Sequence, residues 1–184
     1  MIFISAGHNS KSKKVKRDPG AVANGYKEGD LAIEFRNLVC KELDALRVPY
    51  ITDSDEETLA MYLQRIRTGS GSVVIEYHFD AATNSAATGT TGLIEAAADR
   101  LDKAFAKELT DTTAAVLGIR NRGVIDEGQS HRGRLGLMRE DGIICLLELG
   151  FISNRSDLDR YFANKDILAR RHAEIIVKYE NIIP

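Results

Sequence analysis

The stretch IICLLELGFI at residues 143–152 predicts a buried strand around which the rest of the chain is organised. A short run rich in Ile and Leu, bounded by polar and Gly residues, is typical of a buried β-strand. Glu148 interrupts this run, although a carboxylate that loses its water without a compensating partner is very costly. Glu148 therefore either ends the strand beside a Lys or Arg, or it faces a polar cleft.

Two other apolar runs end in the same way. Residues 2–7 (IFISAG) lead directly to His8, and residues 73–77 (VVIEY) lead to His78. In an α/β sheet, ligands bind outside the carboxyl ends of parallel strands, so three neighbouring strands of one direction would bring His8, His78 and Glu148 together. Two histidines and a carboxylate are a donor set typical of zinc.

Length and composition favour a single domain over residues 1–184. A chain of 184 residues can bury a self-sufficient core, so no metal is needed merely to hold it folded. The net charge of −2 gives no support for nucleic-acid binding through bulk charge. No apolar run reaches the length of a membrane span, and the N-terminus enters a strand directly, without the pattern of an export signal.

The spacing of apolar residues predicts strands that alternate with helices, the pattern of an α/β fold. Helices are predicted from Glu28 to just before Pro49, from Leu59 to a stop at Gly69, over about 97–117, and as two segments after Asn154. Besides the three strands above, short strands are predicted at residues 50–52, 92–95 and 135–138. We therefore expect a central, mostly parallel (mixed) sheet of about six strands, with helices on both faces.

Three polar loops follow or precede the predicted strand ends. Residues 9–25 carry five basic side chains, which form either a solvated face or a surface that attracts an anionic polymer. Residues 80–92 are mostly small and suit the floor or rim of a cleft. Residues 119–134 contain several arginines and His131, and they are either a surface excursion or a substrate rim. Their position just before the strand that carries Glu148 favours the rim.

The polar residues at the strand ends suggest a hydrolytic metal site. Glu28 lies in the first helical turn, where the helix dipole alone would favour a carboxylate, and it is also a candidate ligand. His8, Glu28 and His78 would give three ligands and leave the fourth position of a zinc ion to water, while Glu148 suits proton transfer. Residue types and spacing alone do not decide which glutamate is the ligand and which the base.

Five segments resemble, in the same order, the motifs of the zinc-dependent N-acetylmuramoyl-L-alanine amidases of phage lysins and bacterial cell-wall enzymes. They are SAGH at 5–8 followed by DPGA at 18–21, KEGDL at 27–31, IEYHFDAA at 75–82, NRGV at 121–124, and LELGFISN at 147–154. Each is weak alone, but together they cover most of the chain and fall on the strand ends inferred above.

The resemblance implies one Zn²⁺ per chain, held by His8, Glu28 and His78, with Glu148 as the catalytic acid and base. It implies hydrolysis of the amide between the lactyl group of N-acetylmuramic acid and the L-alanine of the stem peptide. Peptidoglycan is then the partner, with no nucleic acid and no membrane span, and the oligomeric state stays open. Substrate contacts are predicted for four rim residues: Asp80, Asn121, Arg122 and His131.

Some positions depart from the resemblance, and two alternatives stay open. Asp80 stands where relatives often have Asn, Asp53 stands where Arg is common, and a Lys-rich insert separates His8 from Asp18. The lack of a recognisable signal peptide or wall-binding module favours a minimal phage or prophage lysin, made in the cytoplasm and released to the cell wall. The alternatives are a zinc amidohydrolase for another amide and a non-catalytic wall-binding or regulatory relative.

Overall fold

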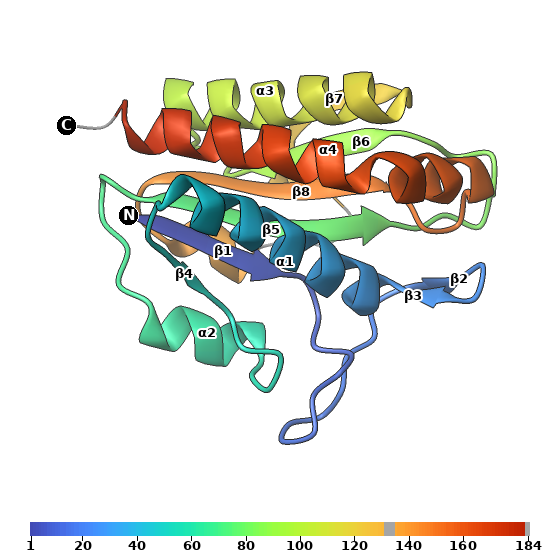
Figure 1. Ribbon diagram of the computed structural model, residues 1–184, viewed down its shortest axis with the longest axis horizontal. Coiled ribbons are helices and arrows are strands. Elements are labelled where there is room, and N and C mark those ends of the chain that lie inside the picture. The colour runs from blue at the N-terminus through green and yellow to red at the C-terminus, as the bar shows by residue number, and fades with distance from the viewer. Residues whose placement is uncertain (131–134, 183–184) are drawn as a thin grey trace.

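A six-stranded sheet forms the centre of the structure, a computed structural model that describes residues 1–130 and 135–182 (Figure 1). The strands lie in the order β4-β1-β5-β8-β6-β7. Their bounds are β1 (Ile2–Ala6), β4 (Tyr50–Thr52), β5 (Val73–Asp80), β6 (Thr90–Ile94), β7 (Asn121–Asp126) and β8 (Ile143–Phe151). A separate two-stranded hairpin joins β2 (Val22–Ala23) to β3 (Tyr26–Lys27).

The strand directions make the sheet mixed, as predicted. Strands β4, β1, β5 and β8 run parallel, whereas β6 is antiparallel to β8, and β7 is parallel to β6. The three strands that carry or precede His8, His78 and Glu148 are therefore neighbours of like direction. In the register between β5 and β8, His78 lies directly opposite Glu148.

Three long helices cover one face of the sheet, and shorter elements cover the other. Helices α1 (Glu28–Leu46), α3 (Arg100–Leu117) and α4 (Arg155–Glu180) lie side by side, and Figure 1 shows α2 (Leu59–Arg65) set apart from them. The short 3-10 helix η2 (Gly136–Arg139) packs with α2 on the second face, and Arg139 of η2 pairs with Glu127 of the 3-10 helix η1 (Glu127–Gln129). No helix in the described part of the chain combines the length and apolar character needed to cross a membrane.

The alternation of side chains along β5 assigns each of its residues to one face. Val73, Ile75 and Tyr77 belong to the large core beneath α1, α3 and α4. Val74 belongs to a second core with Tyr62 of α2, so the residues in step with it, including His78, point to the face that α2 covers only in part. The long helices therefore build the main core, and the polar strand residues remain on the more open face.

Local sequence signals explain where the helices begin and end. On α1, Leu31, Phe35, Val39 and Leu43 recur at helical spacing and are buried. Asp99 and Asp102 form a reciprocal capping box at the start of α3, and Gly118 ends that helix with a φ of 64°. These signals support the predicted helices, although α3 begins at Arg100 instead of near residue 97.

Four other local predictions were wrong. Residues 135–138 do not form a strand, because Leu137 and Met138 bury themselves against α2 from the 3-10 turn η2. The two helices expected after Asn154 are one helix, α4, since no Gly or Pro interrupts its 26 residues. Part of the loop predicted at 119–134 is the edge strand β7, and the loop at 9–25 includes β2.

Candidate metal centre and active site

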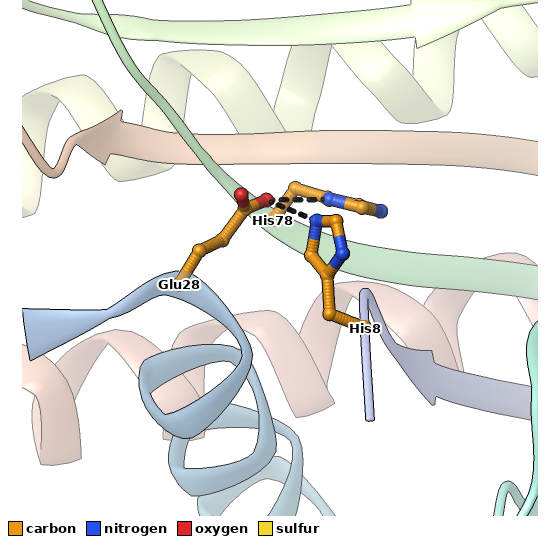
Figure 2. Close-up of side chains that lie close together, drawn as sticks. All are labelled: His8, Glu28 and His78. Carbon is orange, nitrogen blue, oxygen red and sulfur yellow. Dashed lines mark hydrogen bonds and ion pairs between the residues drawn. The ribbon is translucent and has the colours of Figure 1, made fainter. Parts of the chain in front are cut away.

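Three side chains from different elements converge at the carboxyl end of β1. His8 follows β1, Glu28 is the first residue of α1, and His78 lies in β5. One ligand atom from each lies within 4.8 Å of the other two (Figure 2). Glu28 lies between the histidines, because its Oε1 is 2.7 Å from His78 Nδ1 and 3.0 Å from His8 Nε2. The structure thus brings together the three residues predicted as zinc ligands.

Two glycines allow this close approach. A Cβ on Gly7 would lie 2.1 Å from the His78 ring, so any other residue there would displace the imidazole. Gly20, with a φ of 65°, also has no room for a side chain, since a Cβ added there would lie 2.6 Å from both Glu28 Oε2 and the His8 ring. His8 itself has a φ of 72°, an uncommon conformation for a residue with a side chain.

The three side chains strongly shift one another's pKa values. Burial alone would raise the pKa of Glu28, but hydrogen bonds from His78 and His8 hold that pKa far below its usual value. Burial opposes a charge on His78, yet its hydrogen bonds to Glu28 and Glu76 outweigh burial and raise the pKa of His78 to about 10. The pKa of His8 is raised because its contacts with Glu28 outweigh its burial in the same way. The site is therefore an ionised carboxylate that stabilises positive charge on both of its neighbours.

Glu148 is buried on β8 beside His78 and points to the same face of the sheet. It lines a hollow of about 310 Å³ together with Asp80, Arg122 and Ser130. A second hollow, of about 210 Å³, lies on the β1 side and reaches both His8 and His78. The predicted ligands and the predicted acid and base therefore meet between two hollows that a substrate could occupy.

The predicted substrate residues are not all in one place. Asp80 and Arg122 line the hollow of Glu148, and the Arg122 guanidinium lies over the Phe151 ring at 5.2 Å. Asn121 is turned away, because its amide donates to Asp111 at 2.6 Å and lines another hollow. His131 lies outside the described residues, as do the arginines at 132 and 134. The substrate roles of these residues stay predictions.

Two carboxylates that the sequence pattern did not single out contact the outer nitrogens of the histidines. Glu76 Oε1 lies 2.9 Å from His78 Nε2, and Asp18 Oδ2 lies 2.9 Å from His8 Nδ1. Glu76 had a signal, because it is a carboxylate within an apolar run, two residues before His78 and hence on the same face of the strand. Its burial in that run is as costly as the burial of Glu148 on β8.

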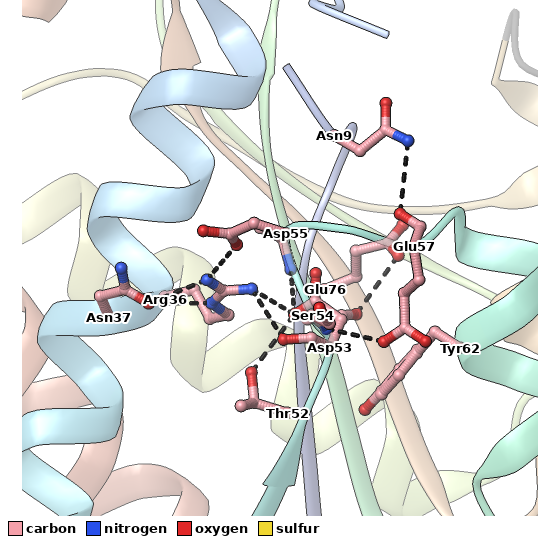
Figure 3. Close-up of polar contacts among 12 residues, drawn as sticks. Asn9, Arg36, Asn37, Thr52, Asp53, Ser54, Asp55, Glu57, Tyr62 and Glu76 are labelled. Atoms are coloured by element: carbon pink, nitrogen blue, oxygen red, sulfur yellow. Dashed lines mark hydrogen bonds and ion pairs between the residues drawn. The ribbon is translucent and has the colours of Figure 1, made fainter. Parts of the chain in front are cut away.

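A buried polar network supports the loop after β4 beside Glu76 (Figure 3). The Arg36 guanidinium on α1 pairs with Asp53 at 2.6 Å and with Asp55 at 2.7 Å. Burial raises the pKa of Asp53 despite this pairing, and its carboxylate also accepts from the backbone N–H of Ala6. Asp53 stands at a position that departs from the family resemblance, and the positive charge of Arg36 on α1 compensates its buried negative charge.

Comparison with known proteins matches this architecture to one family. A family model described as N-acetylmuramoyl-L-alanine amidase matches residues 2–178. None of the curated protein sequences matches the chain. A structure from Neisseria meningitidis, assigned as an N-acetylmuramoyl-L-alanine amidase, is 30% identical with a TM-score of 0.76, over 96% of this chain and 93% of that chain.

Two more distant structures share the fold. The N-acetylmuramoyl-L-alanine amidase from Clostridium difficile 630 is 18% identical with a TM-score of 0.77, over 98% of this chain and 96% of that chain. The catalytic domain of the CD27L endolysin, which targets that organism, is 17% identical with a TM-score of 0.72, over 96% of each chain. The family match over almost the whole chain and the 30% identity to the Neisseria structure together show that this chain belongs to the N-acetylmuramoyl-L-alanine amidases, which hydrolyse the amide between N-acetylmuramic acid and L-alanine in peptidoglycan.

Proposed function

We propose that this amidase works with one zinc ion held by His8, Glu28 and His78, and that Glu148 transfers the proton that hydrolysis requires. The observation that carries the proposal is the convergence of two imidazole nitrogens and one carboxylate oxygen within 4.8 Å. This donor set, with three protein ligands and room for a water, is typical of catalytic zinc sites.

The surroundings of the three side chains fit a metal ion as well. Glycines stand at the two positions where a Cβ would press on the ligands, so the backbone of the loops packs closely around them. The Glu28 carboxylate lies between the two imidazoles and favours positive charge beside it, and a divalent cation at the same point would supply that charge. The residues present therefore fit zinc.

The chemistry divides between the metal and the chain. A zinc ion bound there would polarise the scissile carbonyl and lower the pKa of a water molecule. Glu148 accepts a proton from the attacking water while the water oxygen bonds to the lactyl carbonyl carbon. Glu148 then donates that proton to the nitrogen of L-alanine as the C–N bond breaks. The products are a free lactyl carboxylate and a stem peptide with a free amino terminus.

The hollow beside Glu148 suits the stem peptide. Arg122 presents a planar guanidinium there, which matches the geometry of a peptide carboxylate. Asp80 lies in the same hollow and could accept from a peptide amide. We propose these two residues as substrate contacts and, given the fold shared with the endolysin, a lytic action on the cell wall.

Two measurements test the proposal. Mass analysis of digested peptidoglycan should find stem peptides with free L-alanine amino termini and intact glycan strands. Metal analysis of protein purified without added zinc should find about one zinc per chain. Cleavage of a different amide would instead support the alternative zinc amidohydrolase, and no cleavage with the site intact would support the non-catalytic relative. Less than about half a zinc per chain, with no activity restored by added zinc, would contradict the metal assignment.

A further inference from the structure

The two ring nitrogens of His78 have different surroundings. Nδ1 lies 2.7 Å from Glu28 Oε1, the oxygen that also approaches His8 Nε2. Nε2 lies 2.9 Å from an oxygen of Glu76. Figure 2 shows this second nitrogen pointing away from Glu28 and the other proposed ligand atoms. His78 can therefore join the proposed ligand set only through Nδ1, which leaves Nε2 to Glu76.

This arrangement fixes which tautomer of His78 is useful. A neutral imidazole carries one proton, and a metal ion on Nδ1 requires that proton to be on Nε2. A carboxylate that accepts from the outer N–H favours this tautomer and makes the bound nitrogen a better ligand. We infer that Glu76 is the positioning residue of the proposed zinc site and that its carboxylate holds His78 in the orientation and tautomer that bind metal.

The position of Glu76 makes its orientation well defined. It lies two residues before His78 on β5, so both side chains point to the same face of the sheet. Ser5 is its register partner on β1, and the Ser5 hydroxyl donates to Glu76 Oε2 at 3.3 Å. Glu76 is 2% exposed, so little water competes for its oxygens. Because the backbone of Gly7 also packs closely against the ring, the imidazole of His78 has little freedom to rotate.

The other proposed histidine ligand offers an internal comparison. His8 Nδ1 meets Asp18 at the same 2.9 Å, but the Asp18 side chain is 64% exposed. Hydrogen bonds and charges in contact with water contribute less than buried ones, because water replaces the partner when it is lost. Glu76 should therefore matter more to the metal than Asp18 does.

The test compares zinc affinities of folded protein by competition with a chelator. Glu76→Gln keeps the shape but weakens the acceptor, and Glu76→Leu removes it. We expect roughly a 10- to 100-fold weaker affinity for Glu76→Gln, a loss at least as large for Glu76→Leu, and a smaller loss for Asp18→Asn. Glu57→Gln is the matched control. Glu57 and Glu76 both line the hollow that reaches His8 and His78, but Glu57 pairs with Arg65 at 2.6 Å. Its zinc affinity should stay within about twofold of wild type.

Two further readouts separate positioning from a purely structural role. Nitrogen NMR of the zinc-loaded wild type should show His78 protonated at Nε2, and this proton should exchange faster with solvent in Glu76→Leu. The rise in Tm on adding zinc should shrink in both Glu76 variants, because a weaker ligand stabilises less at a given concentration. A structural role would instead lower the Tm of the zinc-free protein and leave that rise unchanged.

The outcomes distinguish this inference from the proposed function on which it rests. If wild type binds zinc tightly but both Glu76 variants bind it within about twofold as well, the zinc site stands and the role of Glu76 is wrong. An equal loss in Glu57→Gln would also overturn the inference, because it would assign the effect to the charge of the hollow. Failure of the wild type to bind zinc would overturn the proposed function itself. Glu76→Gln alone decides the matter if Glu76→Leu does not fold.

Discussion

Two buried histidines lie on opposite faces of the same sheet and differ in almost every other respect. His78 lies on the face with the two hollows, between the carboxylates of Glu28 and Glu76. His172 on α4 lies in the large core, where its contacts are the Tyr77 hydroxyl at 3.2 Å, the Thr113 hydroxyl at 3.0 Å and the Phe35 ring. The first site is built from charged groups and the second from neutral ones.

Although both histidines are buried, their pKa values are shifted in opposite directions. Burial among neutral partners lowers the pKa of His172 to about 3, so it stays uncharged. Burial also opposes charge on His78, but two carboxylates reverse the effect and raise its pKa to about 10. The neighbouring groups, and not the depth of burial, therefore determine whether each of these histidines is charged. We expect one face to determine activity and the other to determine stability.

The largest expected effect is a loss of activity from the face with the hollows. Glu148→Gln keeps the shape of the side chain but removes the proton acceptor, so amidase activity should fall by roughly 10² to 10⁴. Zinc content should stay at the wild-type level and the Tm should change little. Assays with defined muropeptides, together with metal analysis, check both. Loss of zinc from this variant would show that Glu148 is a ligand.

The second prediction separates the two glutamates of that face. Glu28→Gln replaces an anionic ligand by a neutral one, so zinc affinity should fall by about 100-fold and activity should partly recover at high zinc. Titration of activity with zinc for the wild type and the variant is the measurement. If Glu28→Gln keeps its metal and is merely slow, while Glu148→Gln loses metal, the two roles are the reverse of those proposed.

The third prediction concerns stability and the opposite face. The unfolded chain protonates His172 near its ordinary pKa of 6.5, whereas the folded chain does not until pH falls to about 3. Stability is thus lost as pH falls below about 6.5, and this one group should lower the free energy of unfolding by about 2 kcal/mol between about pH 7 and pH 5. Urea denaturation of zinc-free wild type and His172→Gln measures it.

The control lies in the difference between these two proteins. Other groups titrate in both of them, so only the component due to His172 should be missing from His172→Gln. Equal pH dependence in the two proteins would mean that His172 already takes up its proton in the folded state, which would remove the contrast between the two histidines.

The smallest expected effect lies at the edge of the hollow beside Glu148. If Arg122 binds a peptide carboxylate equally in the ground and transition states, Arg122→Ala should raise KM about 10-fold with little change in kcat. Arg120→Ala is a useful comparison, because Arg120 lines the same hollow. Equal losses in kcat and kcat/KM for Arg122→Ala would place that residue in the transition state, and no change would leave it without a substrate role.

The sequence was most informative where burial and periodicity act together. Strands β1, β5 and β8 are buried apolar runs, and the polar residues His8, His78 and Glu148 stood out against them. Parallel neighbours then had to bring those residues to one end of the sheet, so their convergence could be predicted from the sequence. The assignment of Glu28 as the proposed ligand and of Glu148 as the proposed acid and base came only from the resemblance, because residue type and spacing do not distinguish the two carboxylates.

The rest depended on contacts that a single sequence does not reveal. Strand β7 is an edge strand with exposed residues at its start, so its alternation was too weak to separate it from a loop. The turn η2 resembles a strand in sequence because Leu137 and Met138 are apolar, but tertiary packing against α2 sets its conformation. Glu76 was passed over because its partners, His78 Nε2 and Ser5, depend on strand register and ring orientation.

The left-handed backbone of His8 has a consequence for how this enzyme could change over time. At a φ of 72°, the backbone conformation costs histidine about 1 kcal/mol more than it would cost glycine. Glycine would remove that backbone cost, but it would also remove the contacts of the His8 ring with Glu28 and Asp18 and, with them, the proposed metal ligand. Backbone comfort and the proposed metal site therefore make opposite demands on this position, so a screen for more stable variants of this amidase has to select for cleavage at the same time.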